Sequence, residues 1–206
     1  MSGTIVAQRI DAVRNRRALV AAAEQVFADV GPDAPLELVA KRAHVGRGTL
    51  YRHFKDRIDL AAAVYEEHLT ELEEYVTARA DEPEIALELM TRIAELQGQA
   101  RGIQPLLLRA ATGRERLATL SSRTRVLLAG PLATSKRAGV ISDDITIEDL
   151  LVAVDMVEGA LGSLGRDEAP GVARRAFSLL IPALQNGPGQ PLSEFWVEPK
   201  AGDAAS

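Results

Sequence analysis

The sequence of 206 residues contains no cysteine, which excludes a disulfide framework and a thiolate metal site. Aromatic residues make up only 4% of the chain, whereas alanine and leucine are abundant. Strands favour aromatic and β-branched residues, and helices favour alanine and leucine. The composition therefore favours an all-α fold. Its hydrophobic share of 47% and charged share of 26% are ordinary for a soluble globular protein.

Long apolar segments are missing as well. Uninterrupted apolar runs such as 19–23 and 150–154 are far too short to cross a bilayer. Residues 1–17 mix polar and charged groups and contain no apolar core of a secretory signal. We therefore expect a cytoplasmic protein.

The sequence also lacks the usual signs of catalysis. Its three histidines form no i, i+4 pair that would suggest a metal site. No serine lies in a recognisable nucleophile motif, and no glycine-rich loop could hold a phosphate. We expect no catalytic residue, no bound metal and no cofactor, and hence no enzyme.

Charge is unevenly distributed along the chain. The net charge of −5 argues, taken whole, against nucleic-acid binding. Residues 1–60, however, hold ten lysines and arginines against seven acids, a net +3, and the remainder holds 14 against 22, a net −8. This asymmetry suggests an N-terminal face that meets phosphate and a body that does not.

Apolar residues recur at steps of three and four through most of the chain, which predicts amphipathic helices. About nine are expected, over 11–30, 36–43, 47–53, 56–79, 83–99, a short segment ending near 111, 114–138, 147–164 and 170–186. Asp56 with Asp59, and Thr146 with Asp149, have the spacing of helix caps. No strand pattern is present.

Two of these helices are short and are joined by a tight turn at residues 44–46. Ala40 and Ala43 are small enough to let the helices cross closely, and Val45 and Leu50 fill the space between them. The outer face of the second helix then carries Arg47, Gly48, Thr49, Tyr51, Arg52 and His53. Such groups can reach base edges in a major groove and bind phosphate. The segment predicts a DNA-binding helix-turn-helix.

The stretch Gly48-Thr49-Leu50-Tyr51-Arg52-His53-Phe54 resembles the recognition helix of the TetR family of bacterial repressors nearly residue for residue. The preceding Ala40-x-x-Ala43-x-Val45 resembles the family's first helix and turn. The likeness runs from Ala18 to Leu69, about a quarter of the chain. The remainder is similar to the family only in the number and length of its helices.

The resemblance implies a DNA-binding set of Arg47, Gly48, Thr49, Tyr51, Arg52, His53, Lys55 and Arg57. The first three would face the groove at the start of the recognition helix. Tyr51 and His53 would bind backbone phosphates. Lys55 and Arg57 would bind phosphate near the start of the next helix. Tyr51 is also a packing residue, and Arg52 is equally compatible with a solvated surface cation.

Three positions depart from the family pattern. His44 stands where the turn normally has glycine, so a left-handed backbone is expected there at some energetic cost. Gly46 replaces the usual serine or threonine cap. Leu36 replaces a hydroxyl residue that often contacts phosphate, which removes one contact. None of these changes contradicts the fold.

Three regions follow from this comparison: a helix-turn-helix DNA-binding domain at 1–60, a helical effector-binding and dimerisation domain at 61–187, and a flexible tail at 188–206. The last two helices are apolar, and the first of them is rich in small residues, so we expect them to pack against their copies in a homodimer. Two recognition helices would then reach successive major grooves roughly 34–36 Å apart.

We therefore expect a ligand-responsive transcriptional regulator, acting as a repressor, that binds palindromic double-stranded operator DNA and is released by a small-molecule effector. The alternative is a helical ligand-binding module whose DNA-binding head no longer functions. The basic residues of 1–60 and the intact recognition segment oppose that alternative. The sequence does not identify the effector or the residues that bind it.

Isolated polar residues of the second domain receive simpler interpretations. Asp155 and Glu158 interrupt an apolar helix, and we expect a solvated helix edge rather than a ligand pocket. His68 is expected on the surface. Arg109 and Arg123 are likewise expected to be solvated side chains rather than ligand-binding residues.

Overall fold

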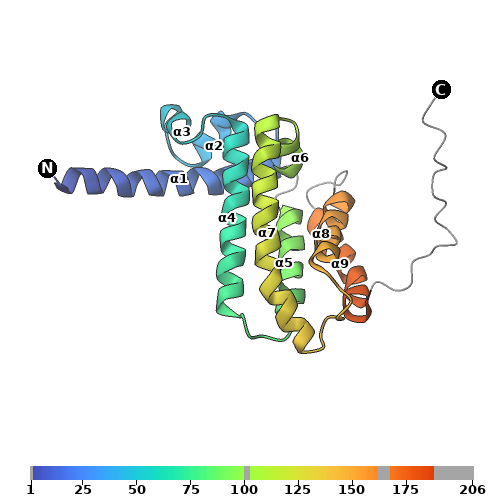
Figure 1. The fold of residues 1–206 in the computed structure, drawn as a ribbon. Helices are drawn as coiled ribbons and strands as arrows, with labels where there is room; N and C mark the ends of the chain where they lie inside the picture. Colours follow the sequence, from blue (N-terminus) through green and yellow to red (C-terminus); the bar gives the residue numbers. More distant parts are fainter. Residues whose placement is uncertain (1, 100–102, 162–167, 188–206) are drawn as a thin grey trace, which may run out of the picture.

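The computed structural model describes residues 2–99, 103–161 and 168–187. Within these ranges the chain is all-helical, as predicted, with nine α-helices and no strand (Figure 1). The helices are α1 (Ser2–Val30), α2 (Leu36–Arg42), α3 (Arg47–His53), α4 (Arg57–Ala78), α5 (Ile85–Gln99), α6 (Ile103–Leu108), α7 (Ala111–Arg137), α8 (Ile147–Leu161) and α9 (Ala169–Asn186). The expected tail at 188–206 lies outside the described residues.

The long helices α4 and α7 run side by side, with α5 packed against both (Figure 1). The short helices α2 and α3 lie at one end of this group, where α1 crosses α4 and extends beyond the rest of the molecule. The helices α8 and α9 pack on each other and on α5. No helix of the described residues is both long and apolar enough to pass through a membrane.

Two separate hydrophobic cores hold the helices together. The first core joins α1, α2, α3 and the first half of α4, and Phe27, Leu50 and Phe54 are among its fully buried side chains. The second core joins the rest of α4 to α5, α7, α8 and α9. Tyr65 packs against both cores, so α4 is shared between them.

The short helix α6 belongs to the first core, although it comes after α5 in the chain. Ile103, Leu106 and Leu107 of α6 are buried among residues of α1 to α4. We expected this segment to belong to the second domain, at 61–187. Periodicity showed that the segment is apolar but not which core it would join.

The predicted helix caps are confirmed. The Asp59 N–H donates to Asp56 Oδ1 at 2.8 Å, and the Lys55 N–H donates to Asp59 Oδ2 at 3.1 Å. At the start of α8 the pair is reciprocal: the Thr146 N–H donates to Asp149 Oδ2, and the Asp149 N–H donates to Thr146 Oγ1. Each pair satisfies backbone donors that the first turn of a helix leaves without partners.

Three helix starts differ from the predictions by two residues or more, and one of them is that of α7, which begins at Ala111 rather than at residue 114. Helix α1 begins at Ser2 rather than at residue 11, because residues 2–10 lack an apolar stripe and periodicity does not detect them. Helix α5 begins at Ile85 rather than Pro83. The N–H of Ile85 donates to the carbonyl of Glu82, so Pro83 lies in a turn that precedes the helix.

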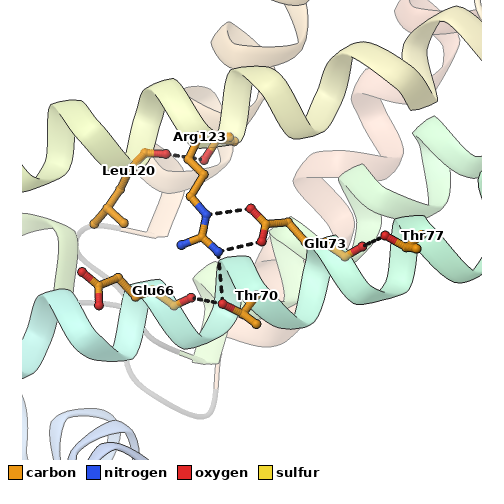
Figure 2. A network of polar contacts seen from close by, with 7 residues as sticks. Glu66, Thr70, Glu73, Thr77, Leu120 and Arg123 are labelled. Atoms are coloured by element: carbon orange, nitrogen blue, oxygen red, sulfur yellow. Dashed lines mark hydrogen bonds and ion pairs between the residues drawn. The ribbon is translucent and has the colours of Figure 1, made fainter.

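A bidentate ion pair joins α4 to α7 (Figure 2). Arg123 Nε and Nη2 each donate to a carboxylate oxygen of Glu73 at 2.6 Å, and Nη2 also donates to Thr70 Oγ1 at 3.1 Å. These hydrogen bonds raise the pKa of Arg123 and lower the pKa of Glu73. Arg123 is therefore a bridge between two helices rather than an isolated surface cation.

The start of α5 depends on a hydroxyl from another helix. Ser135 of α7 is fully buried, and its Oγ accepts the N–H of Ala86 at 3.1 Å. Ser135→Ala should lower the free energy of unfolding by about 1–3 kcal/mol, because the buried Ala86 N–H loses its partner. Urea denaturation measures the effect.

Ser122→Ala is the matched control. Ser122 lies on the same helix but is exposed, and its hydroxyl donates to the carbonyl of Ala118 within that helix. The Ser122→Ala substitution should change the free energy of unfolding by less than about 0.5 kcal/mol. Equal effects of the two substitutions would contradict the role given to Ser135.

Candidate nucleic-acid interface and effector pocket

The turn between α2 and α3 has the left-handed residue that the sequence analysis expected. His44 has a φ of 55°, and the Val45 N–H donates to the carbonyl of Ala40 at 3.0 Å. Gly46 occupies the cap position of α3 and provides no side-chain hydrogen bond. The turn reverses the chain so that α3 packs across α2 through Leu50, which is 1% exposed.

With Leu50 buried, the opposite face of α3 points outward. Arg47, Gly48, Tyr51, Arg52 and Lys55 are exposed, and Thr49, His53 and Arg57 are half-buried. The structure thus brings the whole predicted set to one end of the molecule, on α3 and the start of α4. Burial of Phe54 directs the chain from one helix into the next.

The arginines on this face are held by weak contacts within the head, by which we mean α1, α2, α3 and the first half of α4. The Arg47 guanidinium lies 5.5 Å from the centre of the Tyr51 ring and 3.2 Å from Glu37 of α2. Arg52 donates to the carbonyl of Gly48 and to Thr49 Oγ1. Exposed ion pairs contribute about 0–1 kcal/mol, so these contacts can be exchanged for phosphate or base contacts at little cost.

Three members of the predicted set also have structural contacts. Arg57 Nη1 donates to the carbonyl of Pro32, which joins the start of α4 to the turn after α1. The backbone N–H of Lys55 belongs to the α4 cap. The His53 ring centre lies 6.4 Å from that of Phe54. Part of the Arg57 guanidinium is therefore committed to the fold.

Helix α1 adds cations that the residue-by-residue prediction omitted. Arg14 and Arg17 are exposed on α1. Arg16 instead packs over the Phe54 ring, with its guanidinium 5.0 Å from the ring centre. The excess of positive charge in residues 1–60 was the sequence signal for these groups.

Comparisons with known proteins agree with this geometry. Residues 19–64 match the family model of bacterial regulatory proteins of the tetR family. The TetR transcriptional regulator SCO0520 from Streptomyces coelicolor has the same fold, with a TM-score of 0.65 and 26% identity. That alignment covers 82% of this chain and 97% of the other. This chain carries a DNA-binding domain of the TetR family.

Two further proteins are similar to this chain. The TetR transcription regulatory protein from Mycobacterium vanbaalenii matches with a TM-score of 0.66 at 24% identity, over 86% of this chain and 98% of that one. The HTH-type transcriptional regulator SAB2452 of Staphylococcus aureus is 39% identical over 62 residues, which is 30% of this chain. This match covers 34% of the curated relative's length. These proteins are named as transcriptional regulators, which agrees with the expectation that the chain is no enzyme.

The structure contains a pocket that the sequence did not reveal. The cavity has a volume of about 60 Å³. Its lining comes from α4, α5, α6, α7 and α8: Tyr65, His68, Leu69, Leu72, Ile93, Leu96, Gln97, Ile103, Gln104, Thr124, Val154 and Glu158.

His68 is buried, so its predicted surface position is wrong. It is 9% exposed, lines the pocket, and its Nε2 lies 2.8 Å from Glu24 Oε1 of α1. The hydrogen bond from His68 holds the pKa of Glu24 below its usual value. His68 follows Val64 by four residues and precedes Leu72 by four, which places it on the buried stripe of α4.

The predicted solvated edge of α8 is correct for Asp155 and wrong for Glu158. Asp155 is exposed, whereas Glu158 is half-buried and lines the pocket. Burial, with a smaller contribution from Asp155, raises the pKa of Glu158 to about 7. One turn of helix separates the two carboxylates, and the packing of α8 decides which of them meets the pocket.

The pocket lies at the junction of the two cores. Ile103 lines the pocket and is buried in the first core, and Tyr65 packs against both cores. Polar contacts cross the same junction: Arg116 of α7 lies 2.5 Å from Asp59, and Arg109 lies 2.8 Å from Asp33. A change in the pocket can therefore reach the head through α4 and α6.

The bond between His68 and Glu24 should be visible in the pH dependence of stability. His68→Leu should lower the free energy of unfolding by about 1–3 kcal/mol at neutral pH, because Glu24 loses its partner. The folded-state pKa of Glu24 is lowered, so its contribution is present above the unfolded-state pKa and disappears as the pH falls through the folded-state value.

The difference between the wild type and His68→Leu should therefore shrink as the pH falls below the ordinary pKa of a glutamate, in urea titrations at each pH. Glu66→Gln is the control, because the Glu66 carboxylate is half-exposed and lies 3.9 Å from Arg16. Its effect should stay within about 0.5 kcal/mol at every pH. A difference for His68→Leu that is independent of pH would contradict the assigned bond.

Proposed function

We propose that this protein is a ligand-responsive transcriptional repressor that binds palindromic operator DNA as a homodimer and is released by a small-molecule effector. The observation that carries the proposal is the outward face of α3. Its exposed cations and hydroxyl groups stand on a short helix whose other side is packed through Leu50. This is the arrangement that a recognition helix needs in a major groove.

Roles within the DNA interface follow from position and contacts. Arg47, at the start of α3, is exposed and could form a bidentate contact with guanine. Lys55 and Tyr51 lie at the edges of the face, where phosphates would pass. Arg57 would present to phosphate only the part of its guanidinium that is not bonded to Pro32.

Binding sequences can be selected from a random pool of duplexes. Lys55→Ala should weaken binding to all sequences and reduce the slope of log affinity against log salt by about 1, because one phosphate contact is lost. Arg47→Ala should cost about 1–3 kcal/mol and change the base preference at one position. Fluorescence anisotropy at several salt concentrations measures both.

Arg137→Ala is the matched control, because it removes one exposed cation at the end of α7 far from the head. Arg137→Ala should leave the DNA affinity, the slope of log affinity against log salt and the base preference unchanged. If Arg137→Ala and Lys55→Ala had the same effect, the phosphate contact would be assigned to the wrong residue. If the pool yielded no bound duplex in dilute salt, a ligand-binding module without DNA binding would be favoured instead.

The dimer face is proposed on α8 and α9. Val152 and Met156 of α8 are 55% and 56% exposed, and Leu179 of α9 is 63% exposed. A Cβ atom added to Gly159 would meet nothing, so a second helix has room to approach α8 closely. Two copies related by a two-fold axis would cover these apolar side chains in a four-helix interface.

Met156→Asp should raise the dimer dissociation constant by about a hundredfold or more, because each copy would bring an unpaired charge into the interface. Val126→Asp is the control. Val126 is 76% exposed on α7, outside the proposed face, and its replacement should leave the dimer intact. Sedimentation velocity over a range of concentrations distinguishes the outcomes, and a Met156→Asp dimer as tight as the wild type would place the interface elsewhere.

Release by an effector is proposed because the pocket lies between the head and the body, which consists of the second half of α4 with α5, α7, α8 and α9. A ligand that fits one arrangement of α4 and α6 better than another would shift the population of head positions. The wrong separation of two recognition helices cannot satisfy both half-sites. A protein with this fold, the regulator FadR from Bacillus subtilis, has been crystallised in complex with stearoyl-CoA, which shows that the fold can bind small molecules.

A further inference from the structure

We propose that the effector of this protein is an apolar cation, a hydrocarbon or aromatic body with a protonated amine or amidine at one end, bound with that end between Glu158 and Gln97. The inference rests on the proposed effector response and names the chemical class of the ligand. It is carried by the chemistry of the pocket wall.

Most of the wall is hydrocarbon. The pocket is lined by leucine and isoleucine side chains of α4, α5 and α6, namely Leu69, Leu72, Ile93, Leu96 and Ile103. Val154 of α8 also lines it. Burying apolar surface contributes roughly 25 cal/mol for each Å², and this wall offers such surface on several sides. The body of the ligand is therefore apolar.

Glu158 is an acid placed where its charge is costly. Its carboxyl group is half-buried on α8 against the apolar wall, and its pKa of about 7 means that half of the molecules carry a proton at neutral pH. A cation next to this carboxylate would favour the ionised form and form a charge-assisted hydrogen bond.

The other titratable groups near Glu158 do not neutralise it. Asp155 of α8 adds negative charge. Tyr65 of α4 has a pKa raised by burial and by these carboxylates, so its hydroxyl stays protonated. His68 of α4 is already bonded to Glu24.

Gln97 of α5 points to the same kind of ligand. Its Nε2 donates to the carbonyl of Val154 at 3.1 Å, which defines the orientation of the amide. The Oε1 atom is buried and accepts no hydrogen bond. A buried acceptor without a donor is unusual in a folded protein and is satisfied when a ligand brings the donor. An ammonium or amidinium group has N–H donors for both Gln97 and Glu158.

Anionic ligands fit poorly. No lysine or arginine occurs among the pocket-lining residues that the structure describes. A carboxylate or phosphate at this end would face the Glu158 carboxylate and the unpaired Gln97 oxygen. Like charges and facing acceptors both oppose binding.

Octylamine, octanol and octanoate are suitable probes, because they share one apolar chain and differ only at the end group. Isothermal titration calorimetry on the full chain at pH 8 should give an affinity for octylamine at least tenfold above that for octanol, with octanoate weakest. Lowering the pH to 6 should weaken octylamine binding by about tenfold, because Glu158 then carries a proton in most molecules.

Glu158→Gln should remove the preference for the amine over the alcohol and its pH dependence, and change octanol binding by less than about twofold. Asp155→Asn is the matched control: it neutralises an exposed acid on the same helix and should keep the preference above fivefold. Gln97→Leu should weaken both amine and alcohol by several-fold, because both donate a hydrogen bond to Oε1.

The proposal is overturned if octanoate binds as tightly as octylamine, if Glu158→Gln retains the preference, or if none of the three probes binds at millimolar concentration. These titrations contain no DNA, so they stand apart from the function proposed above. Octylamine binding that leaves DNA affinity unchanged would support the ligand class and contradict effector release. A chain that binds no DNA would contradict the regulator function and leave the ligand class supported.

Discussion

The structure depends on one helix that is shared by two hydrophobic cores. The first half of α4, including Leu60 and Val64, is buried with the helix-turn-helix, and the second half, including Leu69 and Leu72, is buried with the body. A helix cannot bend sharply without losing backbone hydrogen bonds, so the two halves move together. Any ligand that shifts α4 in the body therefore shifts the recognition helix as well.

The contacts at the junction differ in kind from the two cores that they connect. Within each core, close packing of leucine, isoleucine and phenylalanine permits little adjustment. Across the junction, the links are hydrogen bonds and ion pairs such as Arg116–Asp59 and His68–Glu24, most of them partly open to water. The more exposed Arg116–Asp59 pair contributes little and can be exchanged, whereas the buried His68–Glu24 bond contributes more. Adjustment at the junction is therefore confined to these polar contacts, because α4 is continuous through both cores.

The sequence predicted local features well and long-range ones poorly. The caps at Asp56 and Thr146, the turn at His44 and the outward face of α3 all depend on residues within a few positions of each other, and the structure confirms them. The burial of His68 depends on Glu24, which is 44 residues away in the chain. Helical periodicity could have placed His68 on the buried stripe, but it contains no information about the partner that makes a buried histidine acceptable.

The amino-acid sequence by itself determined the helices, their order and the DNA-binding segment, because helix periodicity, caps and the recognition pattern are local properties of the chain. The tertiary structure alone decided that α6 joins the first core, that Glu158 rather than Asp155 meets the pocket, and that Gln97 keeps an acceptor without a partner. Each of these depends on how helices rotate and pack against one another. That choice is made by the fit of many apolar side chains at once, which no short segment encodes.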